Sequence, residues 1–187
     1  MMKKMEDWFI HGLIVPSSLK KIKEKINKKI ETLEKANLKR LSTRGDSVQY
    51  NLKDHINNDL LKTLKEIVLN RYSKLFETDD VDLKLTNAWT VKAEKTGWHK
   101  IHQHNKNVFN ENSISVVIYL ETPKPEERLV DYPGHFYYLF QKNNDSYIRC
   151  EEIPVEEGLI LLMPHWIWHG AYPASGKRQT LNLEFEY

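Results

Sequence analysis

The second half of the chain, from residue 83 onward, is a series of short segments rich in β-branched and aromatic residues, and this series limits the fold most strongly. Clusters of Gly, Pro, Asn and Asp separate the segments, as is typical of strands joined by turns. About eight strands at near-regular spacing predict a sandwich or a barrel. The expected strands cover residues 83–93, 99–104, 113–121, 135–140, 147–152, 159–162, 166–170 and 179–187.

The first half of the chain is predicted to be mainly helical. Residues 8–15 form a short apolar run that ends at Pro16, which favours an edge strand or an extended lead-in. Ser17 or Ser18 then offers an N-cap for a helix. The apolar positions of this helix recur at spacings of three and four, which predicts an amphipathic helix with one buried face. These positions are Leu19, Ile22, Ile26, Ile30 and Leu33.

The region after this helix divides into an irregular part and a second helix. Residues 40–55 are polar and show no clear period, so we expect a loop. The second helix is expected to begin near Asn57 or Asn58 and to continue to Phe76. The 187 residues then fit one domain, with residues 1–80 as helical support and residues 83–187 as a β core.

The composition narrows the class of protein. With 40% hydrophobic and 29% charged residues, it is ordinary for a soluble protein, and a net charge of +2 does not indicate nucleic-acid binding. No apolar run approaches the roughly 18 residues of a membrane span, and residues 1–7 lack a secretory signal. The single cysteine, Cys150, cannot form an internal disulfide. A cytoplasmic location is therefore predicted, while the oligomeric state, a homodimer included, is left open.

Three histidines and one arginine in the second half are candidates for a metal site. His102 and His104 are two residues apart, so on a strand both side chains point to the same face, with Cα atoms roughly 6.5 Å apart. His169 would arrive from a distant strand as the third ligand of a facial site. Arg178 follows nine residues later and offers a planar, two-pronged donor that suits a carboxylate.

The predicted last strand has the clearest alternation between a polar and an apolar face. Its polar face consists of Arg178, Thr180, Asn182 and Glu184. Its apolar face, which is expected to face a core, consists of Leu181, Leu183 and Phe185. The turn at residues 172–176 is expected to bring the strand of His169 beside this last strand, so that Arg178 can lie near His169.

Two further histidines lie close to the candidate ligands in the sequence. His99 precedes His102 by three residues, so on a regular strand it would face the opposite way, and we expect it outside the metal shell; an irregular strand would bring it in. His165 precedes His169 by four residues, a spacing that brings two metal ligands together on a helix but not on a strand.

An ordered series of landmarks runs through residues 87–187. It consists of Gly97, His102-Gln103-His104, Ile118-Tyr119-Leu120, Gly134-His135-Phe136, Pro154, Gly158, the apolar run 159–164, Trp168-His169-Gly170 and Arg178-Gln179-Thr180. In this order the landmarks resemble those of the iron- and 2-oxoglutarate-dependent oxygenases, in particular the small, single-domain, prolyl-hydroxylase-like members. No single landmark is specific, but the ordered set over half of the chain is.

This resemblance implies a mainly β (α+β) fold with a double-stranded β-helix core, also called a jelly roll and similar to that of cupins, and with supporting N-terminal helices. It implies an enzyme that uses Fe(II), 2-oxoglutarate and O2 to oxidise a substrate, most often by hydroxylation, with release of succinate and CO2. The substrate would be a small molecule or a peptidyl group, and its identity is open.

The resemblance also assigns roles to residues. His102, His104 and His169 would hold Fe(II), and Arg178 would pair with the far carboxylate of 2-oxoglutarate. Three polar side chains are candidates for additional contacts with the cosubstrate. These are Tyr119, Thr180 and, as a weaker candidate, Asn182.

One departure from the family pattern concerns His104. The commonest family triad has a carboxylate at this position, so it is open whether His104 ligates directly, whether a carboxylate such as Asp131 completes the site, or whether water or halide does. Two other functions also remain: a cupin-like metal-binding module without turnover, and a three-histidine dioxygenase that does not use 2-oxoglutarate. Arg178 argues against the first of these, because a pure metal-binding module does not need it, and release of succinate under O2 with Fe(II) would separate all three cases.

Overall fold

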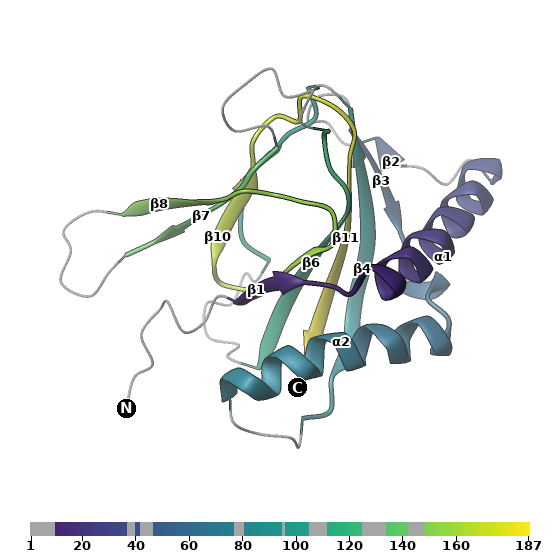
Figure 1. Cartoon of the computed structure of the whole chain (residues 1–187), viewed down its shortest axis with the longest axis horizontal. Coiled ribbons are helices and arrows are strands. Elements are labelled where there is room, and N and C mark those ends of the chain that lie inside the picture. The colour runs from purple at the N-terminus through teal and green to yellow at the C-terminus, as the bar shows by residue number, and fades with distance from the viewer. Residues whose placement is uncertain are drawn as a thin grey trace.

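The computed structural model describes residues 10–36, 40–41, 47–76, 81–94, 96–104, 112–124, 134–141 and 148–187. In these residues, two antiparallel sheets form a sandwich, and two helices cover the outer face of the larger sheet (Figure 1). The predicted mainly β architecture with N-terminal supporting helices is therefore confirmed.

The larger sheet has seven strands, and its middle strands are buried. In spatial order they are β1 (Ile10–Leu13), β9 (Leu159–Pro164), β6 (Ser113–Glu121), β11 (Arg178–Glu186), β4 (Lys84–Ala93), β3 (Ser47–Asn51) and β2 (Arg40–Leu41). Strands β6 and β9 are nearly continuous apolar runs because both of their faces are covered. Strand β1 is an edge strand, as the pattern of residues 8–15 predicts.

The smaller sheet has four strands. In spatial order they are β5 (His99–His102), β10 (Trp168–Ala171), β7 (Phe136–Phe140) and β8 (Arg149–Ile153). Strands β7 and β8 pair with each other and project from the body of the molecule (Figure 1). This sheet supplies two of the three candidate metal ligands.

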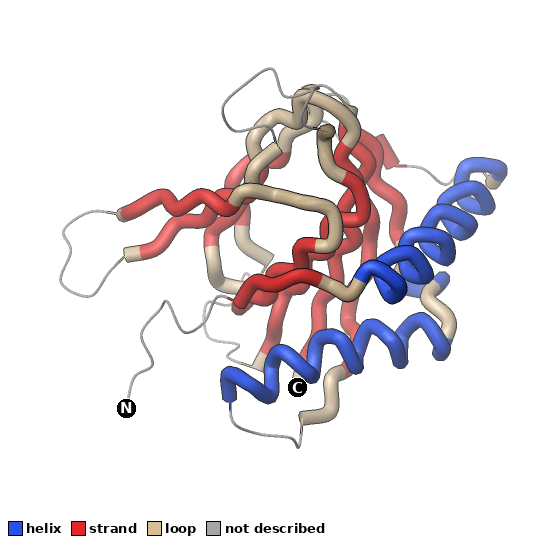
Figure 2. The backbone as a smooth tube through the Cα atoms, in the orientation of Figure 1, coloured by secondary structure: helices blue, strands red, loops and turns tan. Residues whose placement is uncertain are grey.

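The helices α1 (Pro16–Lys35) and α2 (Asn58–Phe76) pack on the outer face of the larger sheet (Figure 2). All five predicted apolar positions of α1 are buried. The helix begins earlier than predicted, with Pro16 in its first turn and Val15 at the N-cap, because the fixed φ of proline suits a first turn. Within the described residues, no helix is long and apolar enough to cross a membrane.

Two separate cores fill the molecule. The first lies between the helices and the larger sheet and contains the predicted apolar face of β11, namely Leu181, Leu183 and Phe185. The second lies between the sheets, over β6 and β9, and includes Val117, Leu161 and Met163. The space between the sheets over β11, β4 and β3 carries polar side chains instead, and the candidate site lies there.

The prediction of a loop at residues 40–55 was wrong. The described part of this region contains β2, β3 and the 3-10 helix η2 (Lys53–His55). Strand β3 pairs with β4, and its Tyr50 is buried in the core beneath the helices. Because β3 has only two apolar positions, Val48 and Tyr50, its alternation is too short to stand out from a polar loop.

Candidate functional site

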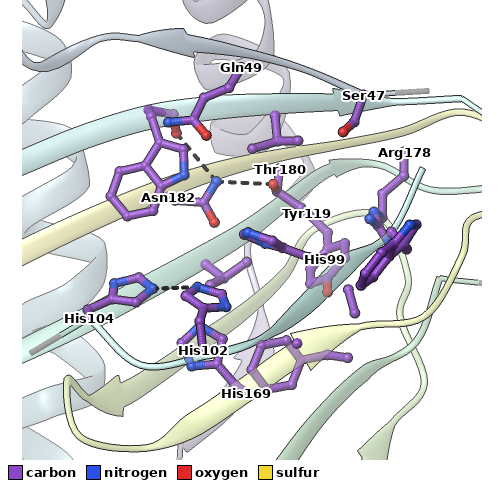
Figure 3. A pocket seen from close by; sticks show the side chains of 17 residues that line it. Ser47, Gln49, His99, His102, His104, Tyr119, His169, Arg178, Thr180 and Asn182 are labelled. Atoms are coloured by element: carbon purple, nitrogen blue, oxygen red, sulfur yellow. Dashed lines mark hydrogen bonds between the residues drawn. The ribbon is translucent and has the colours of Figure 1, made fainter. Parts of the chain in front are cut away.

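A pocket between the two sheets contains most of the predicted site residues (Figure 3). Its inner part has a volume of about 40 Å³ and extends to Arg178, and its outer part has a volume of about 400 Å³ and extends to Glu184. The two parts share the side chains of His99, His102 and His104. The three candidate metal ligands lie at one end of the inner part, and Arg178 lies at the other (Figure 3).

The structure brings His102, His104 and His169 together. His102 ends strand β5 and lies directly opposite His169 on β10. His104 lies two residues beyond β5, where its backbone N–H donates to the carbonyl oxygen of His165 over 3.0 Å. One ring nitrogen from each of the three lies within 4.8 Å of the others, and Nε2 of His102 is 3.0 Å from Nε2 of His104.

Hydrogen bonds to backbone carbonyls fix how two of these rings are protonated. Nδ1 of His102 is 2.9 Å from the carbonyl oxygen of Lys100, and Nδ1 of His169 is 2.9 Å from that of Ile167. A carbonyl oxygen only accepts, so each Nδ1 carries the hydrogen. Each Nε2 is therefore the acceptor nitrogen of its ring, and Nε2 of His102 faces Nε2 of His104.

The ring of His104 also carries its hydrogen on Nδ1, but there the acceptor is a carboxylate. Its Nδ1 is 2.8 Å from Oε1 of Glu184, and the hydroxyl of Ser115 lies 3.1 Å away. Burial alone would raise the pKa of Glu184, but the hydrogen bond from His104 acts against burial, and the pKa of this carboxyl is lowered overall. The ionised carboxylate accepts from Nδ1–H, and Nε2 is left to face His102.

The three rings fit a divalent metal ion. Burial, followed by the proximity of His102 and His104, lowers the pKa of His169 well below its usual value, so His169 is uncharged at neutral pH. With the hydrogen on Nδ1 of both rings, Nε2 of His102 and Nε2 of His104 face each other as two acceptors 3.0 Å apart, and a shared cation removes their repulsion. Two imidazole nitrogens bound at right angles to one metal, each at roughly 2.1 Å, lie about 3.0 Å apart.

Arg178 is a buried cation at the inner end of the pocket, with only 5% of its surface exposed. Its guanidinium donates to three carbonyl oxygens, those of Tyr172 at 2.9 Å, Gly134 at 3.3 Å and Gly97 at 3.4 Å. Among the described residues, no ion pair includes Arg178. Burying a cation without an anion is unfavourable, so this end of the pocket is prepared for an acidic ligand.

The predicted route by which Arg178 reaches His169 was wrong. Strands β10 and β11 do not lie side by side in one sheet, because β10 belongs to the smaller sheet and β11 to the larger one. The segment between them crosses from one sheet to the other. Arg178 and His169 therefore face each other across the sandwich, and both still line the inner pocket.

Tyr119, Thr180 and Asn182 also line the inner pocket, as their alternation predicts. Burial raises the pKa of Tyr119 to about 12, although Arg178 acts in the opposite direction, so its hydroxyl keeps its proton. Asn182 donates from Nδ2 to the hydroxyl oxygen of Thr180 over 3.1 Å. The hydroxyl hydrogen of Thr180 is thereby free to point toward a ligand, while Asn182 orients that hydroxyl.

His99 lies in the pocket, although its odd spacing from His102 predicts that it faces away. The pairing of β5 with β10 contains a bulge, in which His169 lies opposite His102 and Ala171 lies opposite His99. Residues 100 and 101 of β5 thus oppose the single residue 170 of β10, and the alternation is reversed. The ring of His99 lies 4.3 Å from that of His102, but it is not one of the three converging histidines.

Gly170 allows β5, β7 and β10 to approach each other beside His169. A Cβ atom at this position would lie 2.4 Å from the hydroxyl oxygen of Tyr137 and 2.8 Å from the backbone oxygen of His99. We expect Gly170→Ala to lower the free energy of unfolding by about 1–3 kcal/mol, because the backbone of β5 must shift. Chemical denaturation monitored by circular dichroism measures this loss.

Gly12→Ala is the matched control for this prediction. Gly12 also lies on a strand, but a Cβ there would meet nothing closer than Nε of Arg71 at 3.4 Å, which is an ordinary contact. Equal unfolding free energies for the two variants would contradict the proposed crowding at Gly170.

The sequence did not identify several residues of the site. Ser47 and Gln49 were missed because strand β3 was taken for a loop. Trp89 could have been found, because it lies within the predicted strand 83–93 and shares a face with Val91, and it lies opposite Asn182. Asp131, considered as a further ligand, lies outside the described residues.

Comparisons with known proteins agree with this geometry. A family model described as "Putative 2OG-Fe(II) oxygenase" matches residues 87–186. A sequence search of curated proteins gave no significant match. Several hundred solved structures resemble the fold, and three of them are described next.

AviO1 from Streptomyces viridochromogenes Tue57 superposes with a TM-score of 0.67 at 13% identity over 97% of this chain and 90% of that chain. A Pseudomonas putida prolyl-4-hydroxylase gives a TM-score of 0.63 at 12% identity, over 95% of this chain and 91% of that chain. HygX from Streptomyces hygroscopicus, solved with nickel and 2-oxoglutarate bound, gives a TM-score of 0.63 at 12% identity, over 97% of this chain and 84% of that chain. At this identity the likeness shows the fold alone, and it confirms the predicted double-stranded β-helix core.

Proposed function

The chain belongs to the 2OG-Fe(II) oxygenase family, and on this basis we propose that His102, His104 and His169 hold the iron while Arg178 receives the far carboxylate of 2-oxoglutarate. It is accordingly an Fe(II)- and 2-oxoglutarate-dependent oxygenase. One observation carries the assignment of residues. Three histidine ring nitrogens converge in the same pocket that contains a buried guanidinium with no carboxylate partner among the described residues.

The residues between these two ends support a bound keto acid. The protonated hydroxyl of Tyr119 and the hydroxyl of Thr180 line the inner pocket beside Arg178, and both can donate to a carboxylate. Asn182 supports Thr180 by donating to its oxygen. Val117 and Phe136 add apolar surface on the same lining, which reduces access of water to the charged pair.

Bound iron, with 2-oxoglutarate and O2, supplies the oxidising power, and the chain itself contributes binding and orientation. The histidines would supply three ring nitrogens to the ion, and all three line the pocket. Arg178 determines which end of the keto acid lies far from the histidines, because its planar fork favours a bidentate carboxylate. Hydroxylation of the substrate, with release of succinate and CO2, is the reaction that we propose.

The outer part of the pocket is the proposed substrate site. It borders His102 and His104 directly and has a volume of about 400 Å³, which suits a small molecule or one side chain of a peptide. Its described lining includes Gln49, Asn51 and Trp89, which offer amide groups and an aromatic surface.

We also propose a reducing compartment such as the cytoplasm, because the exposed Cys150 is the only cysteine.

The experiment that tests this function is a decarboxylation assay. Purified protein with Fe(II), 2-oxoglutarate and O2 is expected to release succinate slowly even without a substrate, and a metal chelator should stop the release. A pure metal-binding module would bind Fe(II) without forming succinate. A three-histidine dioxygenase would consume O2 with its own substrate when 2-oxoglutarate is left out. Either of these results would contradict the proposal.

A further inference from the structure

Glu184 occupies a specific place behind one of the three histidines. It lies on β11, opposite Ser115 of β6 and Asn87 of β4 in the strand register. Its carboxylate accepts from Nδ1–H of His104 over 2.8 Å, and its side chain is only 18% exposed. The side chain of Asn87 lies against the same carboxylate and helps to lower its pKa. Glu184 is thus fixed from two sides rather than free in solvent.

The three histidines are not supported in the same way. Nδ1–H of His102 and Nδ1–H of His169 each donate to a backbone carbonyl, which carries only a partial charge. Nδ1–H of His104 donates instead to a carboxylate, which carries a full negative charge. A carboxylate behind a ligating histidine orients the ring and makes the opposite nitrogen a stronger donor to a metal.

The carboxylate behind His104 matters for the charge balance of a metal site made only of histidines. Three uncharged imidazoles leave the two positive charges of the metal uncompensated. Glu184 cannot itself reach the same ion as a ligand in this arrangement, because it lies on the Nδ1 side of His104, and the converging nitrogens lie on the Nε2 side. It can act only through the His104 ring.

We propose that Glu184 is a positioning residue of the metal centre. It fixes His104 with its hydrogen on Nδ1, so that Nε2 faces the metal. It also supplies, one imidazole ring away, the negative charge that a directly ligating carboxylate would supply. This inference rests on the proposed function, because it assumes that His104 is a metal ligand.

The test is metal affinity, measured by calorimetric titration of metal-free protein with Co(II) under anaerobic conditions. Glu184→Gln preserves the size of the side chain but removes its charge, and we expect it to weaken Co(II) binding by roughly 10- to 100-fold. Glu186→Gln is the matched control. Glu186 lies two residues further along β11, is exposed, and loses the same charge without touching His104. This control is expected to bind Co(II) like the unmodified protein.

A second variant separates positioning from simple structural damage. If Glu184 supplies charge through His104, then a carboxylate placed directly at position 104 should replace it. His104→Asp combined with Glu184→Gln is therefore expected to bind Co(II) more tightly than Glu184→Gln alone. Circular dichroism and the melting temperature verify that each variant is folded.

Three results would overturn the inference: undiminished Co(II) affinity in Glu184→Gln, an equal loss in Glu186→Gln, or no recovery in the double variant. Failure of the proposed function itself gives a different result. In that case the unmodified protein would not bind Co(II) through its histidines, and all variants would behave alike.

Discussion

His169→Ala is expected to abolish specific metal binding, with an affinity loss of more than about 100-fold. This exceeds the roughly 10- to 100-fold loss that is usual for residues that only support a ligand. The ring of His169 is buried, and its Nδ1–H is held by the carbonyl oxygen of Ile167, so no other described side chain can take its place without rearrangement. Calorimetric titration with Co(II), and with Fe(II) under anaerobic conditions, measures the loss.

His165→Ala is the control for this prediction. His165 is also a buried histidine of the same segment, but it is not among the three converging residues, and its ring lies 5.9 Å from that of His104. It should retain most of the metal affinity. If His169→Ala bound metal as tightly as the unmodified protein, while remaining folded by circular dichroism, the metal site would have been placed on the wrong residues.

The features that could be predicted from the sequence are those that repeat along it. The alternation of β11 placed Arg178, Thr180 and Asn182 on one face and a core on the other, because a strand beneath a covered face permits only one register. The three histidines could be chosen because the i and i+2 spacing and the later landmark follow a known order. The alternation of one strand and the order of the landmarks can both be seen in the sequence without knowing which segments meet in space.

The features that could not be predicted depend on contacts between distant segments. The bulge that turns His99 into the pocket exists only in the pairing of β5 with β10, and the sequence of β5 alone does not show it. The assignment of β10 and β11 to different sheets likewise depends on which partners they find. Glu184 was visible on the polar face of β11, but its contact with His104 joins residues 80 positions apart in the sequence.

Arg178→Met is expected to weaken binding of 2-oxoglutarate by roughly 100-fold or more while leaving metal affinity nearly unchanged. Methionine retains much of the apolar stem but removes the charge. Loss of one partner of a buried ion pair costs about 3–5 kcal/mol, and each 1.4 kcal/mol is about tenfold in affinity. Arg178→Lys restores the charge without the bidentate fork, so it should lose less affinity than Arg178→Met. Calorimetric titration of the Co(II)-loaded protein with 2-oxoglutarate gives the three dissociation constants.

Pyruvate makes this prediction specific to the far carboxylate. It has the same keto-acid group as 2-oxoglutarate but no second carboxylate, so it cannot reach the guanidinium at the inner end of the pocket. Its weak binding should therefore be the same in the unmodified protein and in Arg178→Met. Because the substitution also removes one hydrogen bond from each of the carbonyl oxygens of Tyr172, Gly134 and Gly97, the titrations are made well below the melting temperature of each variant. An equal loss of affinity for pyruvate and for 2-oxoglutarate would show that Arg178 maintains the shape of the pocket and does not bind the far carboxylate of the cosubstrate.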